Sequence, residues 1–138
     1  MAFKIASLLD GTHPPFEYFL GKDGEAFALG EALVMDGGRL TKCAADATPE
    51  FICQRTQAAE TPAKTLLPVT RVTETQEYEA PIGAATPTAV VVGSKLTLHT
   101  DGLSLTDSTD GGVFLVSGNP KGAANVAVGD RVAGYFRR

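Results

Sequence analysis

The chain has 138 residues, which fits one domain with a single hydrophobic core, and its formal net charge is −4. This acidic balance argues against free nucleic acid as a partner, because phosphate binding needs clustered lysines and arginines. No stretch of about 20 consecutive apolar residues is present, so the sequence predicts no membrane-spanning helix.

Residues 1–22 are predicted to form an extended N-terminal arm. The step His13-Pro14-Pro15 prevents a helix there, since proline lacks an amide donor and restricts the residue before it. The aromatic residues that follow either fold over the protein's own core or anchor the arm on a partner. We expect the rest of the chain to fold without this arm. The candidate contact residues are His13, Pro14, Pro15, Phe16, Tyr18 and Phe19.

A first hairpin is predicted after the arm. Strands are predicted over residues 31–36 and 39–43, and the Asp36-Gly37-Gly38 step between them is typical of a tight turn. The turn can lie at Asp36-Gly37, at Gly37-Gly38 or over three residues. The Gly37-Gly38 version would place Asp36 opposite Arg39, which is a favourable charge pair.

Three further segments of the first half are predicted to be strands. Residues 51–55 form one, and residues 66–72 form another, in which Pro68 indicates an edge strand or the first paired residue. Residues 74–80 are polar on both faces, so we expect an exposed edge strand.

A second hairpin is predicted near residue 100. Residues 95–99 and 103–106 alternate apolar and polar side chains, and Asp101-Gly102 between them suits a type I′ turn. In that register Leu98 lies opposite Leu105, which gives one leucine-rich face and one polar face.

The chain as a whole is predicted to be mostly β. Its 15 glycines and 8 prolines are spread out and favour turns, and further strands are expected at residues 113–116 and 131–136. We expect a small β-barrel or sandwich-like domain of short antiparallel strands over residues 23–138, preceded by the arm.

No catalytic centre is predicted. The two histidines, His13 and His99, are far apart, and no Cys-x-x-Cys pair or calcium-loop spacing is present. The neighbouring Glu74, Glu77 and Glu79 could be compared with the paired carboxylates of a glycosidase, but a solvated edge strand explains them better. We therefore expect no enzyme activity, no metal and no cofactor.

The cysteine content favours a reducing environment. The only cysteines are Cys43 and Cys53, and residues 1–5 lack the long apolar segment of a signal peptide. We expect production in a reducing cytosol with both thiols free. A disulfide between neighbouring strands is the alternative.

The order of several motifs resembles that of small head decoration, or capsid cement, proteins of tailed bacteriophages. Each motif marks a turn or the start of a strand, and the series covers most of the chain. The segments are His13-Pro14-Pro15-Phe16-Glu17-Tyr18, residues 30–42, Ala47-Thr48-Pro49-Glu50-Phe51-Ile52, Leu67-Pro68-Val69-Thr70-Arg71-Val72, residues 92–102 and residues 129–136.

This resemblance implies a structural virion protein. Such proteins bind the outer surface of the capsid, often as homotrimers, and brace the major capsid protein lattice. The resemblance supplies no catalytic residues and no cofactor, and it implies that residues 1–22 contact the capsid. The alternative function is a receptor- or carbohydrate-binding β-domain of a phage fibre or surface protein.

Overall fold

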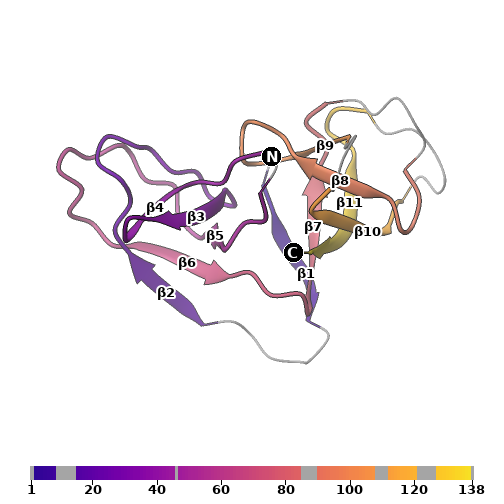
Figure 1. Cartoon of the computed structure of the whole chain (residues 1–138), viewed down its shortest axis with the longest axis horizontal. Coiled ribbons are helices and arrows are strands. Elements are labelled where there is room, and N and C mark those ends of the chain that lie inside the picture. The colour runs from indigo at the N-terminus through magenta and orange to yellow at the C-terminus, as the bar shows by residue number, and fades with distance from the viewer. Residues whose placement is uncertain are drawn as a thin grey trace.

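The computed structural model is an all-β protein made of two antiparallel sheets (Figure 1). It describes residues 2–8, 15–45, 47–84, 90–107, 112–120 and 127–137. Within these ranges no helix is long and apolar enough to cross a membrane. The predicted mostly β fold class is therefore confirmed.

Six strands form the first sheet and five form the second. The six-stranded sheet has the order β1 (Lys4–Leu8), β7 (Gln76–Pro81), β11 (Arg131–Phe136), β10 (Phe114–Gly118), β8 (Lys95–Leu98) and β9 (Leu105–Asp107). The five-stranded sheet has the order β2 (Phe16–Phe19), β6 (Leu67–Arg71), β5 (Phe51–Cys53), β3 (Ala32–Asp36) and β4 (Arg39–Lys42).

The five-stranded sheet curls until its two ends meet. The chain that leaves β2 lies beside β4, where the amide of Leu40 donates to the carbonyl oxygen of Leu20 and the amide of Lys22 donates to that of Leu40, both at 3.0 Å. The concave face then encloses an apolar cluster of its own. Its members are Phe27, Leu33, Leu40, Phe51, Cys53, Leu67 and Val69, with Phe19 and Met35 packed against them.

The six-stranded sheet closes in a similar way. Ile82, just past β7, forms a parallel bridge with Leu105 of β9, and the amide of Gly83 donates to the Leu105 carbonyl oxygen at 2.8 Å. Aromatic rings fill the interior around Phe136, which makes edge contacts with three other rings at centroid distances of 5.2–5.3 Å. These rings belong to Phe3, Tyr78 and Phe114.

The two sheets share one core. Ala32 and Ile52 of the five-stranded sheet belong to the same buried cluster as the interior of the six-stranded sheet. The main chain also links them, because the amide of Ala32 donates to the carbonyl oxygen of Gly102 at 2.8 Å.

The first predicted hairpin is confirmed with one of its alternative turns. Asp36 pairs with Arg39, and the two loop residues are Gly37 and Gly38. Their φ angles are 60° and 81°, which a two-residue type I′ turn requires and which glycine adopts without strain.

The second hairpin has the predicted register but a different turn. Leu98 pairs with Leu105, and both are fully buried. Asp101 does not adopt the positive φ that a type I′ turn needs, so the tight turn lies one residue earlier and closes by a 3.1 Å bond from the Gly102 amide to the His99 carbonyl oxygen. The Asp101 carboxylate holds this longer loop by accepting from the Leu103 amide at 2.8 Å.

Strand β7 corrects the prediction of an exposed edge at residues 74–80. It lies between β1 and β11, and its residues Gln76, Tyr78 and Ala80 are buried. The prediction failed because Gln76 counts as polar, although it is buried and accepts a hydrogen bond from the Tyr78 hydroxyl. On the opposite face Glu77 accepts from Ser7 at 3.2 Å and from Ser117 at 2.6 Å.

Strand β6 is also an inner strand, which corrects the edge position inferred from Pro68. Pro68 is its second residue and pairs with Tyr18 of β2. Its carbonyl oxygen accepts from the amide of Gln54, which lies just past the end of β5. Because β5 ends there, the missing amide hydrogen of the proline interrupts no hydrogen bond within the sheet.

The N-terminal segment is part of the folded domain and not a separate arm. Residues 4–8 pair with β7 and residues 16–19 pair with β6, so the segment gives one edge strand to each sheet. Removal of residues 1–22 would take away these two strands and open the contact with Leu40, and the expectation that the domain folds without them stays a prediction.

Gly134→Ala is expected to lower the free energy of unfolding by about 1–3 kcal/mol, because the added methyl group overpacks the core. It would overlap the carbonyl oxygen of Leu115 and lie 2.5 Å from the Phe114 ring. Gly118→Ala is the matched control, since its methyl group would lie 3.9 Å from Ala133. Urea denaturation of both variants measures the difference, and equal midpoints would contradict the prediction.

Candidate binding surface at strand β2

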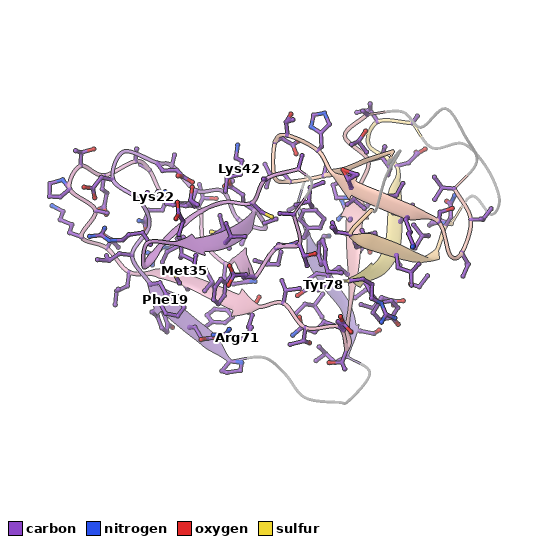
Figure 2. All side chains as sticks on the ribbon, in the orientation of Figure 1. Phe19, Lys22, Met35, Lys42, Arg71 and Tyr78 are labelled. Carbon is purple, nitrogen blue, oxygen red and sulfur yellow. The ribbon has the colours of Figure 1, made fainter. Side chains whose placement is uncertain are left out.

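Strand β2 contains Phe16, Tyr18 and Phe19 of the predicted contact residues, and the exposed Pro15 directly precedes it. His13 and Pro14 lie outside the described residues. The side chains of Phe16 and Tyr18 point to one face of the strand and are 53% and 56% exposed. Phe19 points to the other face and packs against the core, with its ring 5.5 Å from that of Phe51 (Figure 2). The structure thus brings together two exposed aromatic residues, while Phe19 has a packing role.

An ion pair fixes β2 to its neighbour β6. The Arg71 guanidinium donates to both carboxylate oxygens of Glu17, at 2.8 and 3.0 Å, and lies 5.0 Å from the centre of the Phe51 ring. Hydrogen bonding to Glu17 raises the pKa of Arg71 further, so the guanidinium stays charged. The exposed aromatic residues are therefore carried by a strand whose position is set and whose own charge is compensated.

Among the described residues, no strand pairs with the outer side of β2. Neighbouring residues of a strand direct their N–H and C=O groups to opposite sides. In β6 the residues Pro68 and Val72 bond toward β5, which leaves Leu67 and Val69 to bond to Phe19 and Glu17.

The same alternation places the remaining groups of β2 on its outer side. Leu20 and Lys22 bond away from β6, to β4. Phe16 and Tyr18 direct their main-chain groups to the same side as Leu20 and Lys22, but they come before the chain reaches β4. Their N–H and C=O groups therefore line the open edge of the five-stranded sheet.

An apolar groove of about 500 Å³ lies beside β2, between the two sheets. Phe16 forms one wall, and the N-terminal strand β1 contributes Ile5. Leu29 is 54% exposed at its rim, while Ile52 and Tyr78 form its buried floor. The residues that line the groove come from distant parts of the sequence, so no single segment of the sequence could predict it.

The polar cluster around Asp101 does not form a catalytic triad. The buried Ser104 hydroxyl donates to both Asp101 carboxylate oxygens at 2.9 Å, and His99 Nδ1 lies 3.7 Å from the same carboxylate. In a triad the serine hydroxyl would instead bond to the histidine. The cluster holds the turn of the second hairpin.

Cysteine and metal chemistry find no support in the described residues. Cys43 and Cys53 are both buried and are not joined in a disulfide, and burial raises the pKa of Cys53. Across the described ranges no group of three or more His, Cys, Asp or Glu residues is placed to hold a metal ion.

Comparison with known proteins finds no protein family whose model matches the chain, and no match among curated proteins. The functional argument therefore rests on the molecule itself. Its most distinctive surface is formed by the two exposed aromatic residues Phe16 and Tyr18, the open main-chain edge beside them and the adjoining groove.

Glu31 is a buried carboxylate that sequence reasoning missed. It is 4% exposed and accepts from the Ala28 amide at 3.0 Å. Burial raises its pKa, and this effect outweighs the Ala28 hydrogen bond and the nearby charge of Lys42. A buried carboxylate among loops gives no periodic sequence signal, because it lies just before β3 and not within a strand.

Glu31→Gln is expected to leave the protein at least as stable as the wild type at pH 7–8, because the amide keeps the acceptor for Ala28 without a buried charge. A raised carboxyl pKa favours folding at low pH, and this contribution is lost as the pH rises through the folded-state pKa. The advantage of the variant should therefore shrink as the pH falls toward 4.5.

The measurement is urea unfolding of both proteins across this pH range. The exposed Glu74→Gln variant controls for the loss of one negative charge. An advantage of Glu31→Gln that grows on acidification would contradict the assignment.

Proposed function

We propose that this protein decorates the capsid of a tailed bacteriophage, where it binds the outer surface of the head and stabilises the lattice of the major capsid protein. The order of turn and strand motifs along the sequence supports this function. So does the all-β fold, whose described part offers a sheet edge for binding.

The exposed pair Phe16 and Tyr18 is the observation that carries the proposal. Large aromatic residues on a surface supply much of the binding energy of protein interfaces, because they bury a large area at a small cost in side-chain entropy. Here they sit on a strand that the Glu17–Arg71 pair holds in place. Aromatic side chains on a strand held in this way are suited to bind the surface of an assembled shell.

Assembly as a homotrimer would strengthen such a contact. Three linked copies of one weak site raise the net affinity without new contacts, provided that all three reach the lattice together. A protein that binds the assembled shell and not its free subunits stabilises the shell by mass action.

The position of the aromatic residues favours this function over carbohydrate or receptor binding. Among the described residues, the aromatic side chains that are more than half exposed are Phe16 and Tyr18, both on a strand. A carbohydrate reader would be expected to present such rings on loops around a pocket, where sugars stack on them.

Phe16→Ser combined with Tyr18→Ser is expected to reduce binding to capsids at least tenfold, because two anchors of this kind are worth about 2 kcal/mol or more. The assay mixes the purified protein with expanded empty capsids and follows co-sedimentation and the melting temperature of the capsids. The wild type should co-sediment and raise the melting temperature, and the variant should do neither at the same concentration.

The control is Leu66→Ser combined with Val92→Ser, which removes apolar side chains that are 52% and 70% exposed at other places. It should bind like the wild type. If the wild type neither sediments with capsids nor shifts their melting, the proposed function is wrong. If both variants bind fully, the capsid contact lies elsewhere than on β2.

A further inference from the structure

The open edge of β2 differs from the edge formed by β1. Exposed edges invite pairing with other strands, and proteins usually block them with bulges, lysines or prolines. β1 has an irregularity in its register between Ile5 and Ser7 and begins with Lys4. β2 pairs with β6 in an unbroken register and carries neither lysine nor proline within Phe16–Phe19, although Pro15 directly precedes it, so the regular strand keeps one side unpaired among the described residues.

The free side of β2 is complementary to itself. Phe16 and Tyr18 are two residues apart, and both direct their main-chain groups outward. When two such strands run antiparallel about an axis at Glu17, Phe16 of each copy faces Tyr18 of the other. Both residues of each pair point outward, so they can exchange two N–H to C=O bonds, and the two pairs together make about four.

We propose that two copies of this protein pair through β2, joining their five-stranded sheets into one continuous sheet. The aromatic side chains are the second part of the match. Both lie on the same face of β2, so pairing brings Phe16 of one copy beside Tyr18 of the partner subunit twice. Cross-strand aromatic pairs of this kind are favourable, and each ring loses exposed apolar area.

Electrostatics permits this contact although it brings two acidic residues together. Glu17 would lie opposite Glu17 of the partner subunit, and like charges directly opposite each other destabilise a sheet. Each Glu17 carboxylate, however, already accepts two hydrogen bonds from the guanidinium of Arg71 in its own chain. Each copy therefore brings a neutral ion pair to the axis, on the face opposite the aromatic rings.

The partner is a second copy because the match is symmetric. A strand of another protein would have to supply outward N–H and C=O groups and apolar side chains at this spacing. A second β2 has both, because its sequence is the same. The contact spans only four residues of each chain, so its area is small and we expect a weak, reversible dimer. The inference does not depend on the capsid function, although pairing would cover the same aromatic residues.

Glu17→Cys provides the sharpest test. At the axis of an antiparallel pair, two facing residues that do not share hydrogen bonds have their Cα atoms about 4.5 Å apart, within the range that a disulfide bridges. We expect this variant to form a covalent dimer under mild oxidation. The native cysteines are both buried, so the wild type should stay uncrosslinked. Ser7→Cys, on the exposed edge strand β1, is the matched control and should not crosslink efficiently.

Tyr18→Pro tests the same contact without a covalent bond. The substitution removes an outward-pointing amide and leaves the bonds from Glu17 and Phe19 to β6 in place. Sedimentation equilibrium of the wild type should show a monomer–dimer equilibrium at concentrations between about 10 µM and 1 mM. The variant should melt at a temperature close to that of the wild type and stay monomeric at concentrations at least tenfold higher.

Two results would overturn the inference. One is a wild type that stays monomeric throughout while Glu17→Cys crosslinks no faster than Ser7→Cys. The other is a trimeric mass without a disulfide at position 17, which would place self-association at another surface. Capsid co-sedimentation is measured separately, so either result leaves the proposed function standing, and a failure to bind capsids leaves the dimer standing.

Discussion

The hydrogen bonds between Leu40 and the chain that leaves β2 are the constraint on which the five-stranded sheet depends. They turn an open sheet into a nearly closed one, so that its concave face becomes an interior that encloses Phe27 and Phe51. They also divide one extended segment between two tasks. Its second half closes the sheet, while Phe16 and Tyr18 come too early to reach β4 and stay open to solvent. The exposed edge is thus a consequence of closure and not a defect in it.

In the six-stranded sheet, β7 and the residue after it likewise pair with two different strands. The first residues of this strand pair with β1, and Ile82 just beyond it reaches Leu105 of β9, so one stretch of chain serves two neighbours on the same side. Because consecutive parts of one strand can pair with different neighbours, short strands are enough to build a closed interior. Phe136 fills the space thus enclosed, and Gly134 lets the Phe114 ring approach the main chain.

Local features of the fold could be predicted from the sequence, and long-range ones could not. The turn at Gly37-Gly38 and the pairing of Leu98 with Leu105 follow from short-range spacing, and both are present. The inner position of β7 was missed because the polar character of Gln76 is satisfied by a neighbouring hydroxyl in the folded state only. The pairing of residues 4–8 and 16–19 with the two sheets was missed for a related reason, since an edge strand carries a weak pattern. The groove beside Phe16 unites segments that no local window contains.

Polar side chains in the interior are engaged within the fold, whereas main-chain groups on the outer side of β2 are not paired with another described strand. Among the described residues, no buried side-chain nitrogen or oxygen lacks a hydrogen-bond partner. Carboxylates that might have suggested chemistry are engaged within the fold, as Glu77 is by two serines and Asp101 by its own turn. Catalytic groups, in contrast, are usually held ready for a substrate and show it in their geometry. The open polar groups on β2 belong to the main chain and lie beside two exposed rings, an arrangement that is complementary to another strand.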